Sequence, residues 1–189
     1  SALAAFALWA SGKGKSWLLC IGPVGCGKTM LMKAALSSGV MARGTGYYLT
    51  GSNFNRRVKD FTDEPHMVTP DEYVNRLSAL PGQLLLDDIG AGYYDKSGYT
   101  MSRLEQLLSM RYEFSLPLAI ATNLGAVELQ EHLGARAFSR LSDRAVCERV
   151  QSRHSSSRAK RVTSNSNRAM ATSLMARPRE RSCPGPPPA

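Results

Sequence analysis

Five short apolar segments, separated by stretches of helical periodicity, constrain what this chain can fold into. They span residues 17–21, 46–50, 83–87, 118–122 and 145–150, and the first four are dense in Leu, Ile, Tyr or Cys. Strands that are covered on both faces need such continuous apolar character. Strands that alternate with helices along a chain indicate a parallel sheet with helices on its faces. We therefore predict an α/β fold in which helices sandwich a five-stranded parallel sheet.

Two of the helices between these strands can be read directly. Apolar residues recur at helical spacing from Met101 to Tyr112, which predicts a helix over 100–114. A second helix is expected to begin after Thr69, because this possible cap is followed by a proline and two acidic residues.

Composition and charge divide the 189 residues into three parts. A content of 43% hydrophobic and 21% charged residues is a globular mixture, which excludes wholesale disorder. Residues 151–189 differ, since they are rich in Ser, Arg and Asn and contain eight Lys or Arg against one Glu, most of the formal charge of +9. We predict a linker or remnant over 1–14, a folded domain over 15–150 and a basic, disordered tail over 151–189. The tail is either a phosphate-binding arm or a solvated terminus.

Nothing in the sequence indicates a membrane or an oxidising compartment. The apolar run from Ala2 to Ala10 is half as long as a bilayer requires, and no basic residues precede it as they precede a secretory core. The chain begins with Ser1, which suggests a cut from a longer protein. The four cysteines form no Cys-x-x-Cys pair. We expect a cytoplasmic protein that has no membrane partner.

The first predicted strand leads into the segment Gly-Pro-Val-Gly-Cys-Gly-Lys-Thr, which fits the pattern G-x-x-x-x-G-K-[ST]. An apolar strand before it and an amphipathic helix over 28–36 after it supply the context that this pattern needs. Its glycines let backbone amides and the positive helix end point at phosphates. Lys28 would neutralise β and γ oxygens, and Thr29 would offer a hydroxyl to Mg²⁺. The alternative is a glycine-rich turn that precedes a lysine by chance. We expect ATP phosphates on Gly22, Pro23, Val24, Gly25, Cys26, Gly27, Lys28 and Thr29.

Two carboxylates end the third predicted strand, at the edge where ligands of open parallel sheets bind. Asp87 would hold Mg²⁺ through water, and Asp88 would orient and help deprotonate the attacking water. Glutamate often takes the second role, so the shorter Asp88 is consistent with slow turnover. Alone, an Asp-Asp pair after a strand is as well explained by a helix cap or a turn. After a phosphate-binding loop, it is the expected second half of an ATPase site.

Three further polar residues have two readings each. Asn123 closes the fourth predicted strand, where its amide would hold the hydrolytic water or sense the γ-phosphate, or would simply open the next turn. Arg136 and Arg140 stand four residues apart on one helical face. They are either solvated surface residues or a source of an arginine finger for a neighbouring γ-phosphate.

The residues from Leu84 to Leu141 resemble a known family. The sequences LLLDDIGAG, SRLEQLLSMRYEFSLPLAIATNL and VELQEHLGARAFSRL are similar to the AAA+ module of DnaC-type helicase loaders and IstB-like transposition helper ATPases. With the phosphate-binding loop, the likeness covers about residues 15 to 150. It implies a P-loop NTPase core with little or no lid, ATP and Mg²⁺ as ligands, a sensor at Asn123 and an arginine finger at Arg140. It also implies self-association into an ATP-dependent oligomer, single-stranded DNA as a partner and a replicative helicase as client.

The sequence therefore supports several functions. The first is an ATP-hydrolysing helicase loader in DNA replication. The second is a transposition helper, which would have a transposase as partner in place of a helicase. The third is a nucleotide-dependent module that binds DNA or protein with negligible turnover, which the residue at position 88 makes conceivable. Three basic residues that follow the second predicted strand, Arg56, Arg57 and Lys59, are candidate DNA contacts or a solvated helix face.

Overall fold

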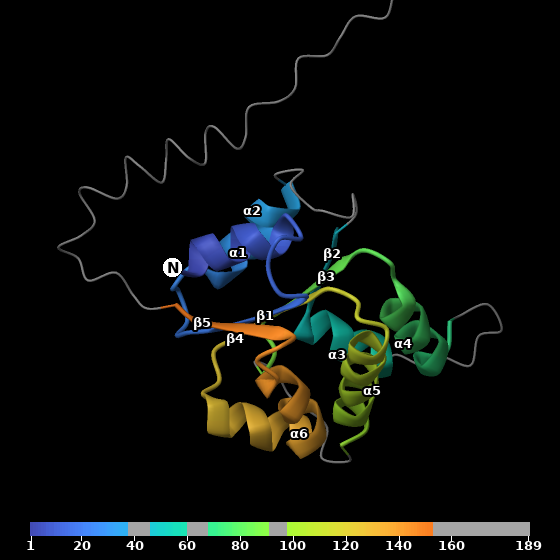
Figure 1. Ribbon diagram of the computed structural model, residues 1–189. Coiled ribbons are helices and arrows are strands. Elements are labelled where there is room, and N and C mark those ends of the chain that lie inside the picture. Colours follow the sequence, from blue (N-terminus) through green and yellow to red (C-terminus); the bar gives the residue numbers. More distant parts are fainter. Residues whose placement is uncertain (38–45, 60–67, 91–97, 153–189) are drawn as a thin grey trace, which may run out of the picture. The chain divides into compact units, whose positions relative to one another are not determined.

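A computed structural model describes residues 1–37, 46–59, 68–90 and 98–152. Within these ranges, five strands form one parallel sheet in the order β2-β3-β4-β1-β5 (Figure 1). The strands are β1 (Trp17–Ile21), β2 (Gly46–Thr50), β3 (Gln83–Asp87), β4 (Leu118–Thr122) and β5 (Cys147–Gln151). The predicted five-stranded α/β fold is confirmed, and the first four strands have the predicted bounds.

The fifth strand begins two residues later than expected. Ala145 and Val146 belong to a turn, in which Ala145 N–H donates to Asp143 Oδ1 (2.9 Å) and Val146 N–H donates to Asp143 O (3.2 Å). The strand continues to Gln151, one residue into the segment that was expected to be the tail. Beyond Ser152, the expected tail, and with it the expected reduction of the lid, lies outside the described residues.

Helices cover both faces of the sheet in two layers (Figure 1). Helices α1 (Ala2–Ala10) and α2 (Lys28–Ser37) lie on one face. The other face carries α3 (Gly51–Lys59), α4 (Pro70–Ala79), α5 (Tyr99–Glu113) and α6 (Ala126–Ser142). The helix predicted over 100–114 is thus α5, shifted by one residue. The predicted cap of α4 is confirmed, since Thr69 Oγ1 accepts the N–H of Glu72 (3.1 Å). Among the described residues, no helix has the length and apolar character to cross a bilayer.

The buried core consists of two clusters, one on each face of the sheet. Because successive side chains of a strand point to opposite faces, Leu118 and Ile120 face the four-helix layer, whereas Ala119 and Ala121 face α1 and α2. The small alanines let α1 and α2 approach the centre of the sheet closely. Each cluster therefore fixes one layer of helices against the strands.

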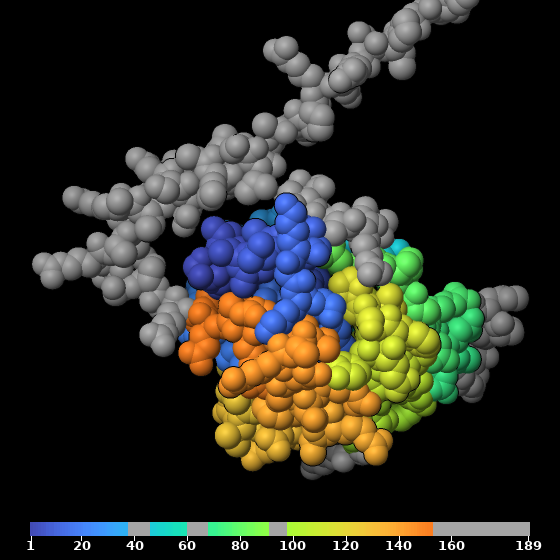
Figure 2. All heavy atoms as spheres, viewed as in Figure 1, coloured from blue at the N-terminus to red at the C-terminus, as the bar shows by residue number. Residues whose placement is uncertain are grey.

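Residues 1–14 were expected to be a linker or a remnant; residues 2–10 instead form helix α1, which packs on the sheet. Phe6 and Trp9 are buried, and Trp9 Nε1 donates to Ser16 O (2.9 Å). The amide of Gln83, at the start of β3, donates to the carbonyls of Trp9 (3.0 Å) and Ala10 (3.2 Å). Figure 2 shows this blue segment packed against the orange end of the described chain. A helix without a polar face gives no periodicity to detect, which explains the difference.

Arg111 on α5 is fully buried and joins several elements at the amino edge of the sheet. Its guanidinium donates to the carbonyls of Leu77 (3.2 Å) and Leu80 (3.2 Å), at the end of α4. It also donates to Gly82 O (2.8 Å) and Pro117 O (2.8 Å), which precede β3 and β4. One side chain thus satisfies the final carbonyls of a helix and the approaches to two central strands.

Candidate functional site

The predicted site residues that follow β1, β3 and β4 meet at the carboxyl edge of the sheet. The phosphate-binding loop, residues 22–29, follows β1, Asp87 and Asp88 end β3, and Asn123 follows β4. These three strands are neighbours in the order β3-β4-β1 and run parallel, so their ends lie together. The fold therefore assembles one site from segments about 100 residues apart.

Hydrogen bonds fix these strand ends to one another. Gly22 N–H donates to Thr122 O (3.2 Å), and Ile89 N–H donates to Ala121 O (3.0 Å). The Thr122 hydroxyl donates to Ile89 O (2.5 Å). Both the loop after β1 and the segment after β3 are thus held by the end of β4, which sits between them.

Backbone conformation gives the phosphate-binding loop its shape. Gly25 (φ 80°) and Gly27 (φ 91°) adopt the left-handed region, which L side chains rarely enter. Turns of this type bring successive amides into a concave anion-binding arrangement. Helix α2 begins directly afterwards at Lys28, so its first N–H groups and its positive end face the same concavity. The loop therefore has the form that a phosphate chain requires.

The side chain of Lys28 is buried, with 8% exposed, and folds back over the loop. Its Nζ donates to Gly22 O (2.6 Å) and to Pro23 O (2.9 Å), and lies 3.6 Å from Cys26 Sγ. The ammonium thus occupies the inside of the loop, within reach of any group that enters the concavity. Thr29 is exposed beside it.

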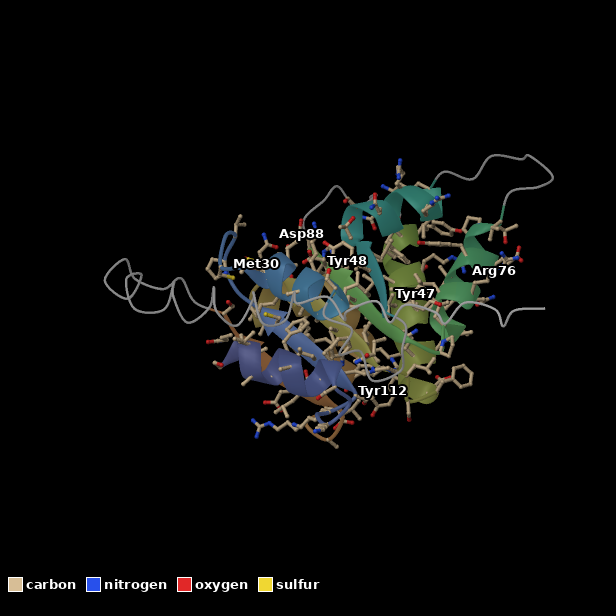
Figure 3. The ribbon with its side chains drawn as sticks, turned by 90° about the horizontal axis from the view of Figure 1, so that it is seen from above. Met30, Tyr47, Tyr48, Arg76, Asp88 and Tyr112 are labelled. Carbon is tan, nitrogen blue, oxygen red and sulfur yellow. The ribbon has the colours of Figure 1, made fainter. Side chains whose placement is uncertain are left out.

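The two acids at the end of β3 have opposite surroundings. Asp87 is 2% exposed; its Oδ2 accepts the hydroxyl of Tyr48 (2.6 Å), whereas its Oδ1 is buried without a hydrogen-bond partner among the described residues. Asp88 is exposed and adopts the left-handed conformation (φ 58°). Burial, and then the hydrogen bond to Asp87, raise the pKa of the Tyr48 phenol. Tyr48 and Asp88 lie near each other in Figure 3.

These surroundings fit a magnesium ion with its water shell. A buried carboxylate oxygen without a partner is costly unless a ligand or water satisfies it. Asp87 Oδ1 provides such an oxygen, and Thr29 provides a hydroxyl on the neighbouring loop. Carboxylate, hydroxyl and water oxygens are the ligands that Mg²⁺ prefers.

Arg140 lies apart from the other predicted site residues. Helix α6 leaves the carboxyl edge after β4 and returns toward the start of β5, with a break at Gly134 (φ 79°). The guanidinium of Arg140 stacks over the ring of Tyr112 (5.7 Å to the centroid), and that ring contacts Trp17, the first residue of β1. The phosphate-binding loop follows the other end of β1. Arg140 is therefore at the amino edge, away from the loop of its own chain.

The structure adds two residues to the site that sequence reasoning missed. Tyr48 contacts Asp87, as described above. Ser152 donates its hydroxyl to Cys26 O (3.1 Å) and its N–H to Ile21 O (2.8 Å). A Cβ at Gly22 would lie 2.4 Å from Ser152 O, so only glycine fits there. Neither residue belongs to a motif, and only the strand order could have revealed them.

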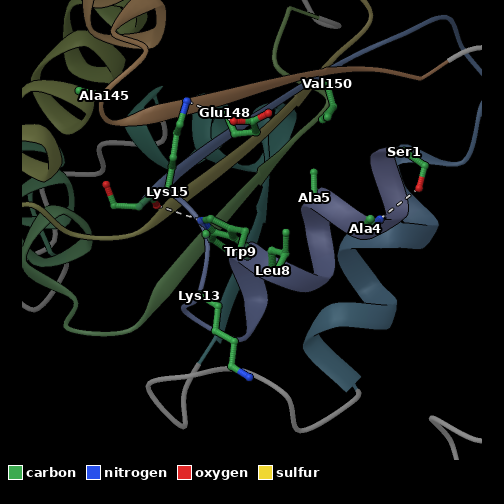
Figure 4. A pocket seen from close by; sticks show the side chains of 12 residues that line it. Ser1, Ala4, Ala5, Leu8, Trp9, Lys13, Lys15, Ala145, Glu148 and Val150 are labelled. Atoms are coloured by element: carbon green, nitrogen blue, oxygen red, sulfur yellow. Dashed lines mark hydrogen bonds and ion pairs between the residues drawn. The ribbon is translucent and has the colours of Figure 1, made fainter.

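A cavity of about 820 Å³ lies elsewhere, between α1, the segment after it and β5 (Figure 4). An ion pair between Lys15 and Glu148 (3.2 Å) and the ring of Trp9 line it. None of the predicted site residues lines this cavity. A phosphate-binding loop presents its ligand to an exposed concave backbone rather than to an enclosed pocket, so the two locations do not conflict.

No family model and no curated protein sequence matches this chain. Solved structures do: the DnaC helicase loader (21% identity, TM-score 0.64) covers 79% of this chain and 87% of its own. DnaI is similar (20% identity, TM-score 0.62, 79% and 82% covered). The replication initiator DnaA bound to AMPPCP and single-stranded DNA matches with 19% identity and a TM-score of 0.60, over 77% of this chain and 44% of its own.

The sheet order and these likenesses together define the fold. The chain has the α/β fold of the P-loop AAA+ nucleotide-binding proteins. That fold is similar to the fold of the DnaC helicase loader and of DnaI, which confirms at the level of fold the resemblance seen in the sequence.

Proposed function

We propose that this protein binds and hydrolyses ATP and acts on DNA, as a helicase loader in replication. One observation carries the proposal. The phosphate-binding loop, Asp87 and Asp88 converge at the carboxyl edge of a sheet with the fold of a helicase loader. The replication proteins among its structural neighbours also support our proposal that it works in the cytoplasm.

Each side chain in this site has a role that follows from its position. The loop amides hold the phosphates, and Lys28 exchanges the Gly22 and Pro23 carbonyls for phosphate oxygens. Thr29 and Asp87 would hold Mg²⁺, which would neutralise phosphate charge when bound. Asp88 is exposed, so it can orient the attacking water and accept its proton, and Asn123 assists from the next strand.

Two partners belong to the proposal. Single-stranded DNA would contact Arg56, Arg57 and Lys59, which are all exposed on α3. A second copy of the chain would receive Arg140, because this residue lies at the edge opposite its own loop. The first role is supported by one structural neighbour, a replication initiator that was solved with single-stranded DNA. The client of the proposed loader is a replicative helicase.

A second candidate function is a nucleotide-dependent binding module with negligible turnover. The short side chain of Asp88 favours it, because a glutamate would reach further toward an attacking water. Hydrolysis measurements separate the two candidates directly.

Titration with a fluorescent ATP analogue tests the nucleotide site. Lys28→Ala should weaken binding roughly tenfold to 100-fold, since a charge-assisted hydrogen bond contributes about 1.5–3 kcal/mol. Lys13→Ala, which removes an exposed lysine beside α1, is the control and should bind normally. Asp88→Asn should also bind normally but lose turnover by about 10²- to 10⁴-fold. Unchanged affinity in a folded Lys28→Ala protein would refute the loop assignment.

Salt dependence of single-stranded DNA binding tests the other half of the proposal. Binding should be weak, independent of sequence and steeply reduced by salt, because phosphate contacts release counterions. Replacing Arg56 and Arg57 by Ala should lower the slope by about 2 if each contacts one phosphate. The experiment uses a chain that ends at His154, so that the basic residues that follow cannot supply the affinity. Complete loss of binding in that shortened chain would contradict contacts on α3.

A further inference from the structure

Tyr48 is the one side chain in the described ranges that hydrogen-bonds to Asp87. It lies on β2, next to β3 in the sheet, where Tyr48 is in register with Leu85 and Thr50 with Asp87. Its hydroxyl reaches along the neighbouring strand to Asp87 Oδ2, at 2.6 Å. The long, rigid ring of tyrosine matches this two-residue offset.

The ring of Tyr48 also contacts the helix that carries the phosphate-binding loop. Lys33 on α2 places its ammonium 5.7 Å from the ring centroid, and the ring packs against the cluster beneath α1 and α2. Tyr48 thus stands between α2, which begins with Lys28, and the carboxylate of Asp87. It is fixed on both sides by groups that belong to the proposed nucleotide site.

The direction of the hydrogen bond is fixed as well. A tyrosine hydroxyl carries a proton at physiological pH, and an ionised carboxylate can only accept a hydrogen bond. Tyr48 therefore donates and Asp87 accepts. One carboxylate oxygen is occupied in this way, and the other, Oδ1, is left buried and without a partner among the described residues.

We propose that Tyr48 is a positioning residue, which holds the Asp87 carboxylate so that Oδ1 is presented to the magnesium ion of a bound nucleotide. This inference rests on the proposed function. Removing a residue that hydrogen-bonds to a metal ligand typically lowers metal affinity about 10- to 100-fold. Tyr48 should therefore control how strongly Mg²⁺ increases nucleotide affinity, without contacting the nucleotide.

The experiment compares affinities for a fluorescent, non-hydrolysable ATP analogue in Mg²⁺ and in EDTA. Tyr48→Phe removes only the hydroxyl. It should reduce the ratio of the two affinities by about tenfold or more while leaving the affinity in EDTA unchanged. Tyr47→Phe is the matched control, because Tyr47 precedes it on β2 and points to the opposite face. Asp87→Asn removes the proposed magnesium ligand itself, so it gives the lowest expected ratio of affinity in Mg²⁺ to affinity in EDTA.

A second readout measures the metal itself. Electron paramagnetic resonance of Mn²⁺, titrated into the complex with the analogue, should show weaker binding in Tyr48→Phe than in Tyr47→Phe. If Tyr48→Phe fails to fold, Tyr48→Gln and Tyr48→Leu take its place, since the first keeps a donor and the second does not. The ratio should then be higher for Tyr48→Gln.

The outcomes separate this inference from the proposed function. A ratio in Tyr48→Phe equal to that of the natural chain, while Asp87→Asn loses it, overturns the role of Tyr48 alone. If Tyr48→Gln and Tyr48→Leu show the same ratio of affinity in Mg²⁺ to affinity in EDTA, the role of Tyr48 is likewise overturned. If the natural chain binds the analogue without any effect of Mg²⁺, or does not bind it, the proposed function itself fails.

Discussion

Three of the four cysteines lie in the described part of the chain, and they differ in how far their surroundings protect them. Burial raises the pKa of the Cys20 thiol to about 11 and that of Cys147 to about 12. Both side chains are buried, whereas Cys26 is half-buried within the phosphate-binding loop. Because the thiolate is the reactive form, Cys20 and Cys147 should be nearly inert toward alkylation in the folded protein.

We therefore expect iodoacetamide at pH 8 to modify Cys26 well before Cys20 or Cys147. Mass spectrometry of the peptides measures this order, and in denaturant all three should react at similar rates. A non-hydrolysable ATP analogue should slow the reaction at Cys26, because phosphates on the loop cover it. Modification of Cys26 at the same rate with and without the analogue would speak against the loop as the nucleotide site.

At the scale of residues, the sequence predicts those side chains that belong to a motif. Lys28, Thr29 and Asp87 could be named because a spacing pattern specifies them, and the fold brings them together. Tyr48 and Ser152 could not, since their contacts depend on which strands are neighbours. The conformation of Lys28 on its own loop carbonyls was also unpredictable, because a motif states which residue is present and not where its side chain rests.

Arg111 is the clearest case of an element held by one side chain. The guanidinium is fully buried and donates to carbonyls at the end of α4 and before β3 and β4. Arg111→Leu should lower the free energy of unfolding by several kcal/mol, since each buried carbonyl left without a donor costs about 1–3 kcal/mol. Urea denaturation measures the change.

Arg76→Leu is the control for this prediction. Arg76 is exposed on α4 (Figure 3). It pairs with Glu72 four residues earlier, a contact that contributes about 0.3–0.5 kcal/mol in such helices. Similar losses in both variants would mean that the contacts of Arg111 with the backbone carry little stability.

At the scale of elements, periodicity was sufficient where a helix or strand has a distinct pattern. Residues 17–21 and 83–87 are apolar enough to indicate buried strands. The start of α4 could be predicted because Thr69 is a typical N-cap residue. Helix α1 was missed because it is apolar on every side. The break in α6 was not predicted; it falls at Gly134, whose φ of 79° lies outside the helical region.

The position of Arg140 leads to a prediction about the assembled molecule. A finger that acts between subunits contributes about 10³-fold or more to the rate, so Arg140→Ala should bind ATP normally and hydrolyse it poorly. Lys28→Ala keeps Arg140 but has an impaired phosphate-binding loop, so it should also hydrolyse ATP poorly. Mixing the two chains creates interfaces with one intact loop facing one intact Arg140, so steady-state hydrolysis should partly return.

Arg136→Ala provides the matched control on the same helix. Arg136 lies one turn before Arg140 and is exposed, so its replacement should leave hydrolysis nearly unchanged. If mixtures of Arg140→Ala and Lys28→Ala stay inactive although light scattering shows that they assemble, the finger between subunits is wrong and Arg140 is a structural surface residue. Such an interface could not be predicted from periodicity, because it depends on which edges of the domain the fold leaves available.

Ser152 couples the end of β5 to the phosphate-binding loop. Its hydrogen bonds to Ile21 and Cys26, and the absence of room beside Gly22, make it part of the wall of the phosphate-binding loop. Strand β5 pairs with β1 in parallel register, so tension along β5 loads that ladder in shear, parallel to the strands. A pull on the chain beyond Ser152 therefore acts on the loop before it reaches the core. Any load that arrives through the C-terminal residues is applied where the nucleotide is proposed to bind.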